Sequence, residues 1–297
     1  YQAAMITESF CMKHPEELSK RFKGVFLVNM TKPLPVKFKE TLENFQNQGG
    51  LILGDEKSKD AIKGILVVPC GYLRGTNMND FWKAEQTFAP LIEKFKNIVG
   101  LKLKPFFTTP SSKFSVIRSV DGDLEYWTLF NDGKDEEFGS RDGYGIAYQY
   151  TYQGDTAVIA ARKNGTLYDA LRRTVVKTRP KDGGIEFDCD MRYFPGTVYV
   201  LAERPIATLR LKSSKTVASG KLLCLNASAQ DAQGKNFTGK LPMEFIITDP
   251  EGEVRYKLYR RTNEEILLKI AVNDLPGAWK IIATDQATAS SLTHHVV

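Results

Sequence analysis

Histidine is nearly absent from this sequence. His14 lies near the start, and His294 and His295 lie among the last four residues. A Ser-His-Asp or Cys-His arrangement needs a positioned imidazole that accepts the proton of its nucleophile. We expect only His14 to lie within folded structure, because the other two stand at the chain end. Nucleophilic catalysis of this kind therefore has a single candidate base.

Several other functional signatures are missing as well. The chain has four cysteines in 297 residues, which excludes a disulfide scaffold. It contains no Cys-x-x-Cys and no His-Glu-x-x-His, the spacings typical of zinc sites. Neither Gly-x-Gly-x-x-Gly nor the phosphate-binding Gly-Lys-Ser/Thr loop occurs, so the common nucleotide enzymes are disfavoured. We therefore expect no cofactor.

Charge and hydropathy exclude two further classes of partner. Lys plus Arg is 41 and Asp plus Glu is 35, a formal net charge of +6 without a run of five like charges. This mild balance predicts no nucleic-acid partner. The longest apolar stretches, such as Val25–Val28 and Ile65–Pro69, have the length of strands, so we expect no membrane span. Because the chain begins at Tyr1 rather than Met, a leader or a whole upstream region is left open.

Residues 1–110 alternate between strand and helix patterns. Gly24–Asn29 is a continuous apolar run typical of a strand covered on both faces, and Lys37–Phe45 has apolar side chains at helical spacing. Gly49-Gly50 follows and predicts the end of that helix. Leu51–Gly54 then reads as the next strand. This alternation predicts an α/β domain with a parallel, doubly wound sheet.

After Pro110 the apolar period changes from 3.6 to 2, and short strands predict two antiparallel β-sandwich modules, residues 111–204 and 205–297. Asn164-Gly165 stands between two of these strands and predicts a hairpin. Trp127 is expected to be a core residue. The second module has the length and strand number of an immunoglobulin-like sandwich, with Trp279 in its core.

Three sequence blocks together resemble a known arrangement. Phe22–Glu56 (FKGVFLVNMTKPLPVKFKETLENFQNQGGLILGDE) is similar to the glutamine-amidotransferase-like trimerisation domain of bacterial β-galactosidases, which has a flavodoxin-like fold. Glu125–Asp132 (EYWTLFND) and Gly165–Leu171 (GTLYDAL) resemble the β domain that follows it in large secreted glycoside-hydrolase-like proteins. Leu241–Gly252 (LPMEFIITDPEG) and Ile270–Trp279 (IAVNDLPGAW) resemble the immunoglobulin-like ends of such proteins.

The resemblance implies a non-catalytic accessory and oligomerisation region of a secreted, periplasmic or cell-envelope protein. Its partners would be further copies of the chain, a glycan, and an upstream catalytic barrel or partner chain. Such a barrel needs about 250 residues of its own, so this chain cannot contain one. Two alternatives stay open: a hydrolase with its own site, and a structural protein of the cell envelope whose tandem β modules act as spacers.

The hydrolase alternative places its site at strand ends of the α/β domain. Asp55 and Glu56 follow an apolar strand, where doubly wound folds bind ligands. Glycoside hydrolysis needs two neighbouring carboxyl groups, and adjacent strand residues point to opposite faces, so these two form a poor pair. Cys70 also follows a strand, in the position of an amidotransferase nucleophile, but no His follows it before the tail. A buried thiol is the simpler interpretation.

Two further groups of residues are candidate binding sites. The acidic, glycine-rich loop over residues 131–145 offers oxygen ligands for calcium, although Lys134 and Arg141 intrude and a surface loop is the simpler interpretation. Its candidate ligands are Asp132, Asp135, Glu136, Glu137 and Asp142. Tyr148, Tyr150 and Tyr152 share one strand face, which predicts core packing or stacking on a sugar ring. Whether Cys189 and Cys224 form a disulfide is left open.

Overall fold

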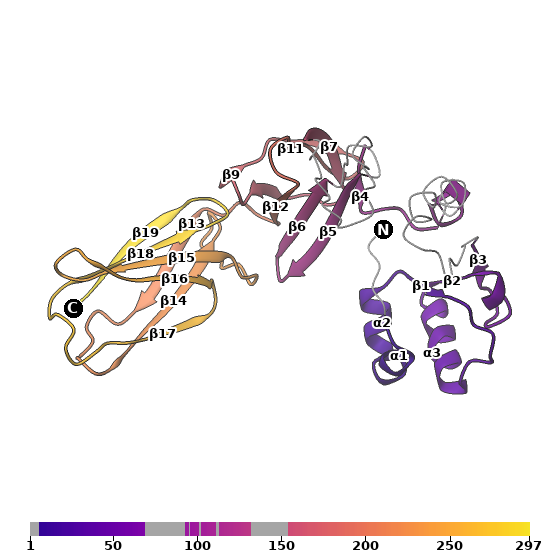
Figure 1. Ribbon diagram of the computed structural model, residues 1–297, viewed down its shortest axis with the longest axis horizontal. Coiled ribbons are helices and arrows are strands. Elements are labelled where there is room, and N and C mark those ends of the chain that lie inside the picture. The colour runs from indigo at the N-terminus through magenta and orange to yellow at the C-terminus, as the bar shows by residue number, and fades with distance from the viewer. Residues whose placement is uncertain (1–5, 69–92, 95, 101, 111–112, 132–153) are drawn as a thin grey trace, which may run out of the picture. The chain divides into compact units, whose positions relative to one another are not determined.

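Figure 1 shows the computed structural model of the chain, which describes residues 6–68, 93–94, 96–100, 102–110, 113–131 and 154–297. The chain divides into two compact units, one ending at Pro105 and the other running from Phe106 to Val297. The first unit combines helices with parallel strands, and the second is built from antiparallel strands.

The first unit holds a parallel sheet with the strand order β1-β2-β3. Local signals set the ends of its helices: Thr7 Oγ1 accepts a hydrogen bond from the Phe10 N–H at 3.1 Å, and Pro15 stands in the first turn of the second helix. Gly49 follows the third helix with a φ of +89°, which confirms the predicted helix end. The elements are α1 (Glu8–Lys13), α2 (Pro15–Arg21), β1 (Gly24–Leu27), α3 (Val36–Asn47), β2 (Leu51–Gly54), the 3-10 helix η1 (Glu56–Ser58) and β3 (Leu66–Val67).

Apolar clusters lie on both faces of this small sheet. Ile52 packs in one cluster with Phe38 of α3, whereas its neighbour Leu53 packs in a second cluster with Val99. Because successive strand residues point to opposite faces, the sheet is a layer between two apolar layers. The described strands follow one another in sequence order without the reversal of a doubly wound sheet. The flavodoxin-like topology therefore stays a prediction.

The first half of the second unit is a β-sandwich. Its described strands form two antiparallel sheets, with the orders β10-β11-β7-β4 and β5-β6-β12-β8-β9. The strands are β4 (Phe107–Thr108), β5 (Phe114–Asp121), β6 (Leu124–Asn131), β7 (Asp155–Ala161), β8 (Thr166–Asp169), β9 (Thr174–Val175), β10 (Thr178–Lys181), β11 (Gly184–Met191) and β12 (Gly196–Ala202).

Large aromatic side chains fill the space between these two sheets. Phe187 of one sheet stacks on Trp127 of the other, with ring centroids 6.2 Å apart, and meets Tyr199 edge-on at 5.0 Å. All three rings are fully or almost fully buried. Each such side chain contributes a large apolar area, so this cluster holds the sandwich together. The prediction that Trp127 is a core residue is confirmed.

The hairpin predicted at Asn164-Gly165 is wrong. The strand before it, β7, and the strand after it, β8, belong to different sheets, so the segment crosses from one sheet to the other. Gly165 is required there because a Cβ atom would lie 2.6 Å from the Ala202 carbonyl oxygen. A hairpin of the expected kind is instead formed by Asp182-Gly183 between β10 and β11, with φ values of +47° and +79°.

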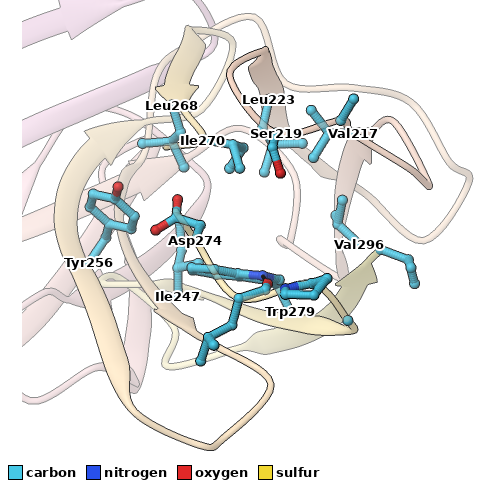
Figure 2. A pocket seen from close by; sticks show the side chains of 15 residues that line it. Val217, Ser219, Leu223, Ile247, Tyr256, Leu268, Ile270, Asp274, Trp279 and Val296 are labelled. Carbon is cyan, nitrogen blue, oxygen red and sulfur yellow. Dashed lines mark hydrogen bonds between the residues drawn. The ribbon is translucent and has the colours of Figure 1, made fainter. Parts of the chain in front are cut away.

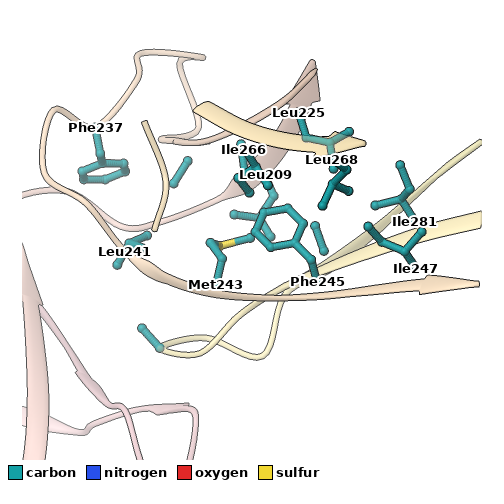
Figure 3. Packing of buried hydrophobic residues seen from close by; sticks show 14 of the residues in the cluster. Leu209, Leu225, Phe237, Leu241, Met243, Phe245, Ile247, Ile266, Leu268 and Ile281 are labelled. Atoms are coloured by element: carbon teal, nitrogen blue, oxygen red, sulfur yellow. The ribbon is translucent and has the colours of Figure 1, made fainter. Parts of the chain in front are cut away.

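The second half of the unit is another β-sandwich, with the sheet orders β13-β14-β17 and β16-β15-β18-β19. Figure 3 shows Met243 and Phe245 of one sheet facing Ile266 and Leu268 of the other. Trp279 is also buried here, as predicted. The strands are β13 (Thr208–Ser213), β14 (Leu222–Gln230), β15 (Pro242–Thr248), β16 (Val254–Arg261), β17 (Glu265–Lys269), β18 (Trp279–Asp285) and β19 (Ser291–Val296).

The expectation that the last histidines lie outside folded structure is wrong. His294 and His295 belong to β19, where they stand opposite Ile281 and Lys280 of β18. The reason is that more buried and exposed side chains alternate up to the chain end: His294 is half-buried, His295 is exposed and Val296 is buried. A period of two over six residues is enough for a strand when a neighbouring strand supplies the pairing.

Candidate functional site

The predicted carboxylate pair at the end of β2 is split by the fold. Asp55 is buried, and its Oδ1 accepts hydrogen bonds from the Ser58 N–H at 2.9 Å and from Ser58 Oγ at 2.6 Å. Its Oδ2 accepts a hydrogen bond from the Asn29 N–H at 2.7 Å, which ties the ends of β1 and β2 together. Burial raises the pKa of Asp55, but these hydrogen bonds outweigh it and hold the pKa below its ordinary value. Glu56 is exposed and pairs with Lys59 at 3.1 Å.

The other predicted site residues lie outside the described residues. They are Cys70, Tyr148, Tyr150, Tyr152, Asp132, Asp135, Glu136, Glu137 and Asp142. In the part of the chain that the structure describes, no three His, Cys, Asp or Glu side chains are grouped so that they could hold a metal ion. The proposals of calcium binding and of sugar stacking at those positions therefore stay predictions.

Cys189 and Cys224, whose pairing the sequence left open, are both free. Cys189 is buried in the core of the first sandwich, and this burial raises the pKa of its thiol. Cys224 lies on β14, where its Sγ contacts Glu265 Oε1 at 3.1 Å. The two cysteines therefore do not link the sandwiches.

Glu125 is a buried charge that the sequence reasoning did not single out. It accepts hydrogen bonds from Arg118 Nη2 at 2.6 Å and from the indole N–H of Trp127 at 2.9 Å, and Lys163 Nζ lies 2.9 Å from its Oε1. Burial raises its pKa, but these partners outweigh burial and lower it to about 2. A glycosidase acid needs a raised pKa, so Glu125 is suited to structure rather than to proton donation. Its position on the same strand face as Trp127 and Leu129 is the sequence signal that could have identified Glu125 as a buried charge.

A serine and a histidine meet in the second sandwich without forming a nucleophile. Ser213 Oγ lies 3.1 Å from His294 Nε2. The hydroxyl also donates to the Ser214 carbonyl oxygen at 2.8 Å, so its proton is directed away from the imidazole. None of the described carboxylates is hydrogen-bonded to His294 as the third member of a triad would be.

The two sandwiches are joined at Asp123, in the turn between β5 and β6. Asp123 Oδ1 accepts hydrogen bonds from the Thr238 N–H at 2.8 Å and from the Gly239 N–H at 3.0 Å. Nearby, Asp121 Oδ2 accepts one from the Lys240 N–H at 3.1 Å. A turn of the first sandwich is thus bound to three consecutive residues of the second.

Arg204, in the linker after β12, lies between two carboxylates at this junction. Its Nη2 donates to Asp123 Oδ2 at 2.8 Å, and its Nη1 donates to Asp231 Oδ2 at 2.7 Å. The guanidinium carbon also lies 4.7 Å from the ring centroid of Phe237. The Asp123 and Asp231 side chains are only 15% and 4% exposed, so salt screens these ion pairs less than it would screen pairs at the surface.

Two tyrosines and an apolar layer complete the junction, which we call the sandwich joint. The Tyr126 hydroxyl donates to the Lys240 carbonyl oxygen, and the Ile206 N–H donates to the Tyr168 hydroxyl oxygen at 2.8 Å. One buried cluster spans both sandwiches at this end; it includes Leu124, Tyr168, Val200 and Ala202 from the first and Phe237 and Leu241 from the second. The sandwich joint therefore combines apolar burial with paired polar groups.

A cavity of about 250 Å³ opens into the second sandwich (Figure 2). It lies between the Trp279 ring and the side chains of Leu268 and Ile270, and Asp274 projects into this space. The Trp279 indole N–H donates to the Leu275 carbonyl oxygen at 3.0 Å, which fixes the ring. Because the IAVNDLPGAW block supplies several lining residues, the cavity is a feature of that sequence block.

Comparison with known proteins gives only weak likenesses. No protein-family model matches the chain, and no curated protein matches it. Among solved structures, the chain is similar to α-L-fucosidase isoenzyme 2 from Paenibacillus thiaminolyticus, at 8% identity and a TM-score of 0.40, over 62% of this chain and 41% of the fucosidase. It is also similar to the adhesin InvE of Yersinia pseudotuberculosis, at 10% identity and a TM-score of 0.26, over 63% of this chain and 59% of the adhesin.

A β-glucuronidase from Ruminococcus gnavus is similar over 47% of this chain and 24% of the enzyme, at 14% identity and a TM-score of 0.20. The chain thus spans between 24% and 59% of the length of these three proteins. At such scores the likenesses are partial, and none of them defines the fold or the function. Separately, none of the helices in the described residues is long and apolar enough to cross a bilayer.

Replacing Glu125 by Gln should lower the free energy of unfolding at pH 7 by about 3 kcal/mol, because it breaks a buried, charge-paired network. Since the pKa of Glu125 is lowered from 4.5 to about 2 by folding, its stabilisation is complete above pH 4.5 and is lost as the pH falls toward 2. The difference between wild type and variant should therefore shrink over that range. Urea unfolding at several pH values, followed by tryptophan fluorescence, measures it.

Glu186→Gln is the matched control for this experiment. Glu186 lies in the same sandwich and also pairs with an arginine, Arg179, but its side chain is 23% exposed, whereas that of Glu125 is 2% exposed. Its loss should cost less than about 1 kcal/mol at any pH. Equal effects of the two substitutions would contradict a special role for the Glu125 network.

Proposed function

We propose that this chain is a non-catalytic accessory region of a carbohydrate-active protein, in which the two β-sandwiches form one rigid support. The observation that carries the proposal is the sandwich joint. A flexible tether makes few contacts with the modules that it joins, and it is rich in polar, glycine or proline residues. Here the linker itself, through Arg204 and Ile206, is hydrogen-bonded to both sandwiches.

The polar groups of the joint support a fixed geometry because they are satisfied. Asp123 accepts hydrogen bonds from two backbone N–H groups and from Arg204, and Asp231 accepts from Arg204 and from the Gln233 and Lys235 N–H groups at 3.0 Å and 2.9 Å. A charge that is shielded from water destabilises the folded protein when its ion-pair partner is removed. Bending the joint would separate these partners, so the ion pairs disfavour bending.

Three sheltered carboxylates of the described residues support a non-catalytic role. Asp55 ties two strand ends together, Glu125 is held by three donors, and Asp123 binds the second sandwich. Each of the three has a lowered pKa against the effect of burial. Groups of this kind stabilise a fold, whereas a general acid for glycoside cleavage needs the opposite shift. Burial does raise the pKa of Asp285, but its oxygens accept hydrogen bonds from the Ala287 N–H and from the N–H and hydroxyl of Thr288, which close its own turn.

The roles of the individual domains in this proposal follow from the resemblance of the sequence blocks to glycoside-hydrolase-like proteins. The α/β unit would act as an amidotransferase-like oligomerisation domain that joins copies of the chain. The last sandwich would be immunoglobulin-like. The β modules would support, and contact, glycans near a catalytic barrel supplied upstream or by a partner chain. Such a protein would work outside the cytoplasm, in the secreted, periplasmic or cell-envelope compartment.

Replacing Arg204 by Ala tests the rigid joint directly. In the wild-type chain, ¹⁵N relaxation should give the two sandwiches one common rotational correlation time, because they tumble as one body. The substitution removes both ion pairs and leaves two sheltered carboxylates without their cation. The variant should therefore give two different correlation times while each sandwich keeps its own native spectrum.

Arg179→Ala is the matched control, because Arg179 also pairs with two carboxylates, Glu186 and Asp188, but lies away from the joint. It should leave the common correlation time unchanged. Two different correlation times in the wild-type chain would refute the rigid support.

A second measurement addresses the absence of catalysis. The purified chain should not hydrolyse aryl β-galactosides, because the buried carboxylates of Asp55, Glu125 and Asp285 are held by structural partners and a barrel is expected elsewhere. Turnover should be followed as release of the aryl chromophore. Turnover that is lost in Asp55→Asn, in a chain that still folds, would establish the hydrolase alternative instead.

A further inference from the structure

The cavity beside Trp279 lies at the end of the second sandwich opposite the sandwich joint. Its lining residues Leu223 and Trp279 stand at or next to the first residues of β14 and β18. The opposite ends of these two strands, at Gln230 and Asp285, run toward the cluster and turns of the joint. The cavity is thus independent of the contacts on which the support function rests.

The walls of the cavity are mainly apolar. Besides Trp279 they include Leu223, Ile247, Leu268 and Ile270. A cavity of about 150 Å³ with apolar walls takes up benzene, so a space of about 250 Å³ admits a single compact group of similar or larger size. The aromatic wall adds a ring face that attracts cations.

One charged and one polar group reach this space. Asp274 Oδ2 accepts a hydrogen bond from the Ala271 N–H at 2.7 Å, which fixes the carboxylate, while its Oδ1 accepts none from the described residues. Tyr256 also lines the cavity. Figure 2 shows Tyr256 and Asp274 on the same side of the cavity.

One side of the mouth carries several acidic side chains. Gly277 of the lining lies against Pro250, so the turn Asp249–Glu253 is next to the cavity. This turn carries Asp249, Glu251 and Glu253. Arg255 is bound to Asp249 at 2.7 Å and also interacts electrostatically with Asp274. Lys215 and Lys221 flank the wall formed by residues 217–219, so the acidic side chains lie on one side of the mouth, where Asp274 is the charged group of the lining.

We propose that this cavity binds an organic ammonium group, a compact cation with an apolar surface such as a trimethylammonium head. Its methyl groups would contact the apolar walls, and its charge would lie between the Trp279 ring and the Asp274 carboxylate. A sugar ring fits the site less well, because each buried hydroxyl needs a hydrogen-bond partner and the lining offers few. An inorganic cation would require more oxygen ligands than Asp274 supplies.

Binding of choline to the full chain tests this proposal. Its neutral isostere, 3,3-dimethylbutan-1-ol, has the same shape with carbon in place of the charged nitrogen. Choline should bind at least about tenfold more tightly than the isostere, because only the cation interacts with the indole face and the carboxylate. Saturation-transfer NMR of the methyl protons measures the binding of both ligands. Phosphocholine should bind more weakly than choline, since its phosphate meets the acidic turn. Tighter binding of phosphocholine would overturn a site for an ammonium group that carries no phosphate.

Two substitutions separate the charge from the apolar space. Asp274→Asn should reduce choline affinity about tenfold and leave the isostere unchanged. Trp279→Phe keeps an aromatic core residue and should weaken choline more than the isostere. Glu251→Gln, in the neighbouring turn, is the control and should have a much smaller effect. Equal affinity for choline and the isostere, no binding of choline, or preferential binding of methyl β-galactoside would each overturn the proposal.

Discussion

The guanidinium of Arg204 lies between two carboxylates that belong to different sandwiches, and the arrangement of the second unit depends on this contact. Arg204 stands in the linker, so one side chain connects linker, first sandwich and second sandwich. Arginine suits this position because its planar group offers separate N–H donors to Asp123 and Asp231 while its face lies over Phe237. A lysine would supply one point charge and no such face.

The joint explains why the two ends of the second sandwich differ. At the joint, the strand ends are covered by the first sandwich, and the apolar cluster continues across the boundary through Leu124 and Phe237. At the other end no described neighbour covers the core, and a cavity remains beside Trp279. Well-packed interiors leave few voids of this size, so the uncovered end is the natural place for a ligand.

Local signals in the sequence predicted helix ends and core residues better than they predicted which strands pair. Gly49 ends α3, and Trp127 and Trp279 lie in cores, because each depends on local conformation or on apolarity alone. Asn164-Gly165 failed because a turn signal says where the chain bends and not which strand it will meet. The sandwich joint could not be predicted, because Asp123 and Thr238 are 115 residues apart. No local sequence pattern around either residue indicates that the two will be in contact. Asp55 appeared as a strand-end carboxylate, but its partners Asn29 and Ser58 only become visible in the fold.

Hydrogen exchange in the full chain tests the joint most directly. The Thr238 and Gly239 amides lie in a bend outside the strands, and both donate to Asp123 of the other sandwich. A persistent joint predicts that they exchange as slowly as amides in the core strands of the second sandwich, because exchange requires the joint to open. Exchange at the rate of an unprotected loop would contradict the account, since it would show that the two sandwiches separate readily.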